Sequence, residues 1–222
     1  SSRACRDLST PSPSSSPSPS RDGATHSAPA VAMLLAVAVI VALKGWSYGR
    51  WVLYPLTLFA TWVHEMGHGV TAILVGGSFD RLEIFASAAG LAHTRYPAGL
   101  RSALVSLGGL LAPPIVGCAL LALSRSPRWG RALLYLLVAA IGISLGIWVR
   151  TFVGALLLVP LAVVLWLVAR KLSHGSGLFV VQLLGFTLAL DTVSRLDYLF
   201  TDSVLIDGVQ RASDIGNVAR VL

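Results

Sequence analysis

The sequence predicts an all-α polytopic membrane protein with about six transmembrane helices (a range of five to seven), and three observations support this fold class. Of the 222 residues, 55% are hydrophobic and 12% are charged, about half of the ~25% charged fraction of a soluble domain. The apolar residues gather in runs of about 20, the length that crosses the ~30 Å hydrocarbon core of a bilayer. The net charge of +7 is spread over short loops, which is typical of membrane topology. A lipid bilayer is therefore the expected environment, and no nucleic-acid partner is expected.

The chain divides into three parts by composition. Residues 1–28 are rich in serine and proline, with too few apolar side chains to offset the entropy cost of ordering, so we expect a disordered tail. Residues 29–200 contain the apolar runs and form the membrane domain. Residues 201–222 form a polar C-terminal segment. The chain stops abruptly there and begins without methionine, which is compatible with truncation at either end.

Each apolar segment has its own boundary signals. The first segment is short and ends at Lys44-Gly45. The second begins with aromatic residues, which suit a membrane interface. We expect Gly108-Gly109 and Pro113-Pro114 to interrupt the third. Arg150 separates the fourth from the fifth, so these two form either a tight hairpin or one long bent helix. The predicted segments are 29–43, 51–75, 103–123, 132–149, 152–169 and 178–200.

The segment 76–100 differs in kind from the apolar runs. Phe79, Leu82, Ile84 and Leu91 alternate with polar and small residues, and glycines lie at both ends and in the middle. This pattern predicts a short β-hairpin at the membrane edge.

The residues with the clearest chemistry are His64, Glu65 and His68, which form an HExxH pattern in the middle of the second apolar segment. On a helix, residues i and i+4 lie on one face, so the two imidazoles can converge on one ion. Zinc (Zn2+) accepts such nitrogen ligands and, in catalytic sites, keeps one position for water. Glu65 lies next to the pair and can act as general base on the metal-activated water. The pattern therefore predicts a zinc site with Glu65 as the catalytic residue.

The position of this pattern within a membrane segment strengthens the interpretation, because ionisable groups in hydrocarbon are costly and usually functional. Thr57, Thr61 and Thr71 extend the two histidines into a polar stripe along one helix face. Gly67 and Gly69 remove side-chain bulk beside the stripe, so another helix or a peptide backbone can approach closely. The alternative is a structural cluster in which the two histidines and the glutamate form hydrogen bonds between helices.

The third metal ligand does not follow from the local pattern. The extended form HExxHxxGxxH needs glycine and histidine at two later positions, where the chain has Thr71 and Leu74. The ligand must therefore come from elsewhere, and a carboxylate is the natural choice. We expect Glu83 to be a charged position in an edge strand and His93 to be solvated or interfacial, rather than ligands.

Several motifs together resemble the site-2-protease-type M50 metallopeptidases, in particular their M50B-like branch. They are HEMGHG within a segment, the Gly-rich turn after it, and GGLLAPPIVG in the next segment. LDYLF at 196–200, followed by Ser213-Asp214 and Ala219, is similar to the acidic helix end and the SD…A motif of that branch.

The resemblance covers about residues 35–222 and implies a membrane-embedded zinc metalloendopeptidase of regulated intramembrane proteolysis. It implies that His64 and His68 are ligands, that Glu65 is the base and that a later aspartate is the third ligand. It also implies that the 76–100 segment offers a strand to an unwound substrate.

Four aspartates are candidates for the third ligand. Asp197, near the end of the last segment, matches the resemblance best. Asp191 lies closest to the centre of that segment, although Arg195 four residues later offers it an ion pair. Asp207 in LIDG is similar to the LDG motif of the wider family, and Asp214 matches the branch motif, but both lie in the polar C-terminal segment.

Two functions of different classes remain open from the sequence. The first is an intramembrane zinc metallopeptidase that cleaves transmembrane protein substrates, with residues 29–200 as its metallopeptidase-like domain. The second is non-enzymatic: a catalytically inactive M50-like protein, or a transporter of metal ions or protons, which the polar stripe and the open third-ligand position would suit. Neither function predicts a particular oligomeric state.

Overall fold

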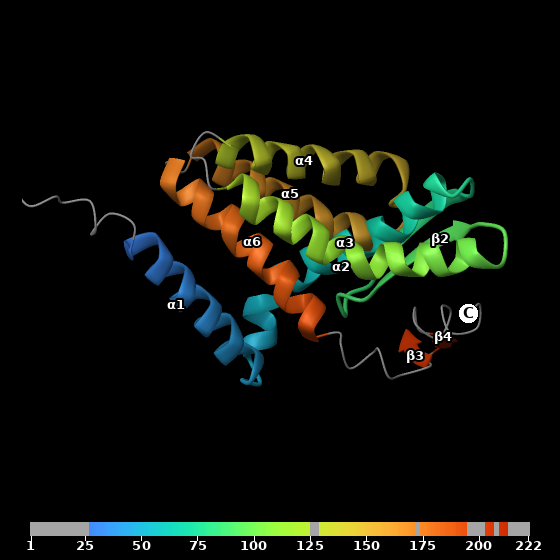
Figure 1. Cartoon of the computed structure of the whole chain (residues 1–222), viewed down its shortest axis with the longest axis horizontal. Helices are drawn as coiled ribbons and strands as arrows, with labels where there is room; N and C mark the ends of the chain where they lie inside the picture. Colours follow the sequence, from blue (N-terminus) through green and yellow to red (C-terminus); the bar gives the residue numbers. More distant parts are fainter. Residues whose placement is uncertain (1–26, 125–128, 172–173, 195–202, 207–208, 213–222) are drawn as a thin grey trace, which may run out of the picture.

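A computed structural model describes residues 27–124, 129–171, 174–194, 203–206 and 209–212. Within these residues the chain forms six helices and two antiparallel strand pairs (Figure 1). The predicted disordered tail falls almost entirely outside the described residues, as do Asp197, Asp207 and Asp214. The elements are α1 (Ser27–Lys44), α2 (Gly49–Leu74), β1 (Ser78–Ile84), β2 (Gly90–Arg95), α3 (Leu100–Leu123), α4 (Trp129–Ile147), α5 (Phe152–Lys171), α6 (His174–Ser194), β3 (Ser203–Ile206) and β4 (Val209–Ala212).

The six helices correspond to the six predicted apolar segments. The fourth and fifth segments form a hairpin rather than one bent helix, because α4 ends at Ile147 and α5 begins at Phe152, and the two helices pack on each other. The helix α6 covers the predicted last segment as far as Ser194, and residues 195–200 lie outside the described part of the chain.

The helix α3 contradicts one expectation from the sequence. It runs without interruption from Leu100 to Leu123, with Pro113 and Pro114 inside it. Proline deprives the preceding turn of a hydrogen bond, yet membrane helices tolerate it where neighbouring helices support the backbone. Contacts with both α2 and α6 provide this support for α3. The close approach to α6 occurs at Gly117, where an added Cβ would lie 2.8 Å from the Gly185 carbonyl oxygen.

The helix α2 is the central element of the fold. It contacts α1, α3, α5, α6 and both strands of the first hairpin. Two glycines allow this dense packing: an added Cβ at Gly67 would meet the backbone of Gly108 in α3, and one at Gly69 would meet the ring of Phe79 in β1. The expectation that these glycines admit close neighbours is thus confirmed. One core of buried side chains joins the hairpin to α2, α4, α5 and α6, and its large members on these helices include Phe59, Leu134, Ile141, Leu158 and Leu188.

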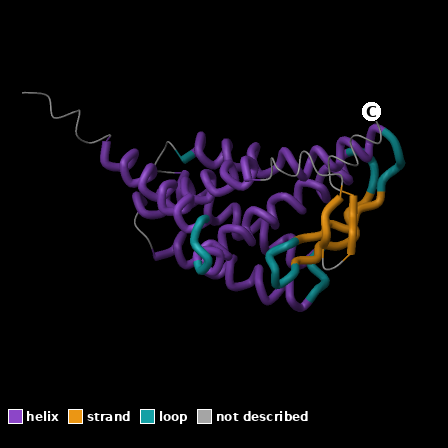
Figure 2. The backbone as a smooth tube through the Cα atoms, turned by 90° about the horizontal axis from the view of Figure 1, so that it is seen from below, coloured by secondary structure: helices purple, strands orange, loops and turns teal. Residues whose placement is uncertain are grey.

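The predicted β-hairpin at 76–100 is present as β1 and β2. The strands pair antiparallel, from Ser78 opposite Arg95 to Ile84 opposite Gly90, with a bulge between Phe79 and Arg81. Figure 2, in which the strands are orange, shows the strands gathered toward one end of the helices.

The α4–α5 connection closes the outer edge of β1. The Leu82 N–H donates to the Trp148 carbonyl over 2.8 Å, and Leu82 forms a parallel bridge with Val149. The Trp148 indole also donates to the Phe79 carbonyl over 3.1 Å. Strand β1 is therefore held on both sides, whereas the outer edge of β2 faces α2.

Helix length and surface composition support a membrane environment. Three helices, α3, α4 and α5, are long and apolar enough to cross a bilayer, and residues 177–193 of α6 form a shorter apolar helix. Large apolar side chains on these three helices point outward, where a soluble protein would place polar residues. They include Leu111 and Ile115 of α3, Leu136 and Ile143 of α4, and Leu156 and Val164 of α5.

Candidate metal centre

His64 and His68 converge as the helical spacing predicts. Their Nε2 atoms lie 3.2 Å apart, and the two rings are nearly perpendicular, at 88°. Two Zn–N bonds of about 2.0–2.1 Å at a tetrahedral angle place the two nitrogens about 3.3 Å apart. The separation of the two nitrogens therefore matches that of two ligands of one zinc ion. The same separation also allows an N–H···N hydrogen bond, which is the structural alternative.

Helix α3 orients the ring of His68. The His68 Nδ1 lies 2.9 Å from the Val105 carbonyl oxygen, and because a carbonyl can only accept, the proton of this hydrogen bond must lie on Nδ1. Nε2 then keeps its lone pair for a metal, the arrangement that commonly supports histidine ligands. The ring can approach because Gly109 has no side chain: an added Cβ would contact Cε1, Nε2 and Cδ2 of the imidazole.

Strand β2 holds the carboxylate of Glu65. The Ala92 N–H donates to Glu65 Oε2 over 2.8 Å. The side chain is shielded, since only 8% of Glu65 is exposed. It also packs against Gly90, where an added Cβ would lie 2.5 Å from Glu65 Cγ. One turn earlier, the Thr61 hydroxyl donates to the Ala88 carbonyl over 2.8 Å. The hairpin and α2 are thus joined directly beside the candidate centre.

The threonines of the polar stripe on α2 contact several different neighbours. Thr61 binds the hairpin, and Thr71 packs where Gly108 of α3 lacks a side chain. The Thr57 hydroxyl donates to the Leu53 carbonyl of its own helix over 3.2 Å and lines a pocket between α1, α2 and α6.

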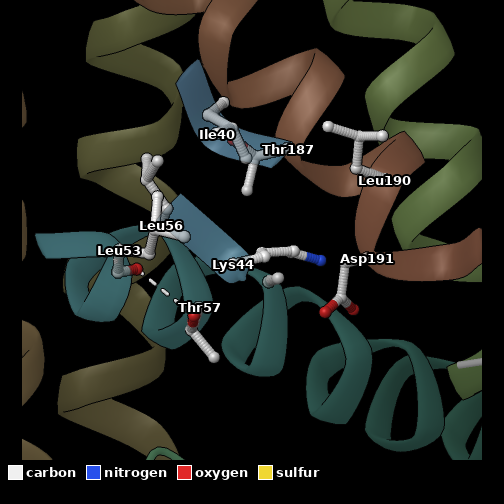
Figure 3. A pocket seen from close by; sticks show the side chains of 9 residues that line it. Ile40, Lys44, Leu53, Leu56, Thr57, Thr187, Leu190 and Asp191 are labelled. Atoms are coloured by element: carbon white, nitrogen blue, oxygen red, sulfur yellow. Dashed lines mark hydrogen bonds between the residues drawn. The ribbon is translucent and has the colours of Figure 1, made fainter. Parts of the chain in front are cut away.

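The structure does not bring Asp191 to the two histidines. Asp191 lines that same pocket, and Figure 3 shows the Lys44 side chain directed toward its carboxylate. Among the described residues, no three His, Cys, Asp or Glu side chains are grouped to hold a metal. The other candidate ligands, Asp197, Asp207 and Asp214, lie outside the described residues.

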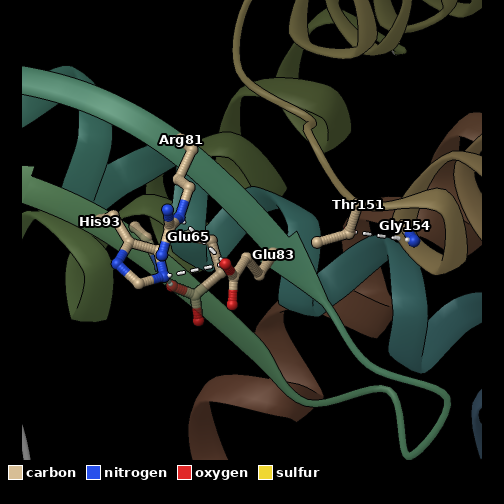
Figure 4. Close-up of polar contacts among 7 residues, drawn as sticks. Glu65, Arg81, Glu83, His93, Thr151 and Gly154 are labelled. Carbon is tan, nitrogen blue, oxygen red and sulfur yellow. Dashed lines mark hydrogen bonds and ion pairs between the residues drawn. The ribbon is translucent and has the colours of Figure 1, made fainter.

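Glu83 and His93 form a charged cluster with Arg81 on the hairpin. Arg81 Nε lies 2.9 Å from Glu83 Oε1 and forms an ion pair with it (Figure 4). His93 Nε2 lies 3.3 Å from the same oxygen, close enough for an ion pair but without the geometry of a hydrogen bond. Glu83 is a charged strand position as expected, but β1 is not an edge strand, because Leu82 pairs with the α4–α5 connection at Trp148 and Val149.

At the open end of the hairpin, Arg95 Nε lies 2.7 Å from Asp80 Oδ2. The hydrogen bond from Arg95, helped by one from Ser78, lowers the pKa of the Asp80 carboxyl below its usual 3.8. This pair links β1 and β2 at the end of the hairpin that begins with Ser78 opposite Arg95.

Three contributors to the centre were missed by the sequence analysis: the Val105 carbonyl, the Ala92 N–H and the space left by Gly109. The first two are backbone groups that any residue supplies, so no residue type marks them. Gly109 could have been found from the sequence, because a pair of adjacent glycines in an apolar helix favours close helix contact.

The chain was compared with known protein families, curated proteins and solved structures. No curated protein and no solved structure matches the chain. The family described as Peptidase M50B-like matches residues 30–222, which includes every helix from α2 onward, both hairpins and the HExxH segment. The chain belongs to the Peptidase M50B-like family.

Proposed function

We propose that this protein is a multi-pass membrane zinc metallopeptidase that hydrolyses peptide bonds of membrane-spanning substrates. The observation that carries the proposal is the 3.2 Å separation of the His64 and His68 Nε2 atoms, with Glu65 held beside them on a helix at the centre of the fold. Family membership supports a peptidase, and the three long apolar helices support a membrane location.

Each residue of the centre has a separate role in this proposal. His64 and His68 hold the zinc ion through Nε2, and Val105 fixes the ring of His68. The bound zinc supplies Lewis acidity that polarises a peptide carbonyl and activates water. Glu65 accepts the proton of the attacking water as general base. His64 and Glu65 are buried, and their limited contact with bulk water strengthens these electrostatic effects.

The third ligand is proposed to be an aspartate from the C-terminal part of the chain. Asp197 is the first choice, because it matches the family resemblance and follows closely after α6. Asp214 and Asp207 are alternatives. Asp191 is the weakest choice, since it lines the pocket that contains Lys44.

The proposed substrate is a single transmembrane helix that unwinds locally, because helical peptide bonds are shielded by their own hydrogen bonds. The outer edge of β2 lies beside Glu65 and suits an extended peptide, which can add to a sheet edge through main-chain hydrogen bonds. This places the unwound segment next to the centre.

The direct test is Glu65→Ala in protein reconstituted into vesicles with a single-span substrate. The matched control is Glu83→Ala, which removes the other glutamate of the chain from the hairpin. We expect Glu65→Ala to abolish cleavage and Glu83→Ala to retain most of it. Undiminished cleavage by Glu65→Ala would refute the mechanism.

A non-enzymatic function is the second candidate, favoured by the 3.2 Å separation of the two Nε2 atoms, which also suits a hydrogen bond between His64 and His68 without a metal. It is either an inactive relative or a pathway for metal ions or protons. Metal analysis separates the candidates. One zinc per chain that is lost in His64→Ala supports the peptidase, whereas zinc flux into vesicles without bound stoichiometric zinc supports a pathway.

A further inference from the structure

The outer edge of β2 places one backbone donor opposite Glu65. Leu82 and Ala92 are paired across the hairpin, and the Leu82 N–H points away from β2 to the Trp148 carbonyl. In an antiparallel ladder both members of such a pair direct their N–H groups outward. The Ala92 N–H is therefore not part of the hairpin ladder, and its hydrogen bond goes to Glu65 Oε2.

The strand that carries this donor is fixed through its partner strand and through the turn before it. Its partner β1 is held by the hydrogen bonds from Leu82 and Trp148. The turn before β2 is tied to α2 by the Thr61 hydroxyl. Both Leu82 and Ile84 are fully buried beneath the sheet. A donor on such a rigid element can fix a partner atom far better than one on a free loop.

We propose that the Ala92 N–H is a positioning group for catalysis: it holds Glu65 through Oε2 and so directs Oε1 toward the water that Glu65 deprotonates. This inference rests on the proposed function. A glutamate side chain has three rotatable bonds, and neither the HExxH spacing nor the histidines restrict where its carboxylate lies. The hydrogen bond supplies that restriction. Its loss should slow the chemical step without weakening binding of the substrate.

The test replaces Ala92 by its α-hydroxy acid, lactic acid, through nonsense suppression in the full chain. The resulting ester lacks the N–H but keeps the shape of the strand. The matched control is the α-hydroxy analogue of threonine at Thr94. By strand alternation Thr94 shares the edge with Ala92 but lies two residues, about 6.6 Å, further along.

We expect the Ala92 ester to lower kcat by about tenfold to a hundredfold, the range known for small misplacements of catalytic groups. KM and bound zinc of the Ala92 ester should stay within twofold of wild type. The Thr94 ester should keep kcat and bound zinc within twofold of wild type, and any loss that it causes should appear in KM, because Thr94 lies on the edge proposed to pair with the substrate. A kcat of the Ala92 ester within twofold of wild type would overturn the inference. So would an equal loss in both esters, because the effect would then be that of any ester in the strand.

A second measurement needs no activity. In protein with 15N-labelled alanine in lipid nanodiscs, the amide proton of Ala92 should resonate far downfield, because its acceptor is a carboxylate. Glu65→Gln should shift this resonance upfield while leaving the resonance of Ala88 nearly unchanged. If the chemical shift of the Ala92 amide proton is the same in wild type and Glu65→Gln, the inference is overturned. A resonance that responds, in a protein that cleaves no substrate, refutes the proposed function but leaves the contact intact.

Discussion

Replacing Gly109 with alanine tests how α3 shapes the candidate centre. The imidazole of His68 lies against the Gly109 backbone, and an added Cβ would be 2.5 Å from Cδ2 and nearer still to Cε1 and Nε2. Ordinary contacts of a Cβ are 3.4–4 Å. The ring must therefore withdraw by about 1 Å, whereas metal–ligand distances tolerate only about ±0.2 Å.

Two losses follow from that displacement. His68 Nε2 leaves the position 3.2 Å from its His64 counterpart, and the 2.9 Å hydrogen bond of Nδ1 with Val105 is broken. Loss of a supporting hydrogen bond alone lowers metal affinity by about 10–100-fold. We therefore expect Gly109→Ala to lower zinc affinity by at least about 100-fold, and peptidase activity to fall with it.

The assay is competition of the purified protein with a zinc chelator, together with metal analysis after gel filtration. Gly117→Ala is the matched control, because it crowds α3 against the Gly185 carbonyl of α6, at 2.8 Å, and not against a histidine. It should lower stability but keep zinc affinity within a few-fold of wild type. Wild-type zinc affinity in Gly109→Ala would refute the reasoning.

Three further predictions concern the hairpin. Thr61→Val leaves the buried Ala88 carbonyl without its donor and should cost about 1–3 kcal/mol, measured by reversible unfolding in mixed micelles. Leu82→Ala removes a side chain with 0% exposure and should cost about 2–5 kcal/mol in the same assay, while an unchanged unfolding midpoint would count against the described core. The lowered pKa of Asp80 means that its contribution to stability is present above its unfolded pKa and is lost as pH falls through the folded value. Stability should therefore decline below about pH 4, the unperturbed carboxyl range, and Asp80→Asn, which ends the charge pairing with Arg95, should flatten that decline.

The helices were predictable because their signal is strong and local. An apolar run long enough to cross a bilayer gives a helix in almost any context, since only internal hydrogen bonds satisfy its backbone there. The boundaries of α1 and α2 fall within about two residues of those expected. The continuity of α3 could not be predicted, because the tolerance of Pro113 and Pro114 depends on neighbours from distant parts of the chain.

The second strand pair had a sequence signal that was interpreted differently. β3 and β4 pair from Ser203 opposite Ala212 to Ile206 opposite Val209, and the two residues that join them are Asp207 and Gly208. An Asp-Gly pair between two short strands is a strong hairpin signal. The sequence analysis considered Asp207 as part of a ligand motif instead.

The two histidines and the glutamate of the centre were predictable from spacing, because helical geometry fixes the relation of residues four apart. Their orientation was not predictable, because it depends on a carbonyl of α3 and an N–H of β2, which belong to segments 37 and 27 residues away. The third ligand poses the same difficulty, because it must come from a distant segment and the chain offers several aspartates.

Zinc K-edge X-ray absorption of the purified wild type and His64→Ala tests the central claim most directly. The account predicts one zinc per chain with nitrogen and oxygen neighbours at about 2.0–2.1 Å, two of them imidazoles, and one imidazole fewer or no zinc in His64→Ala. Wild-type protein that retains no zinc, or a two-imidazole spectrum that survives His64→Ala, would contradict it.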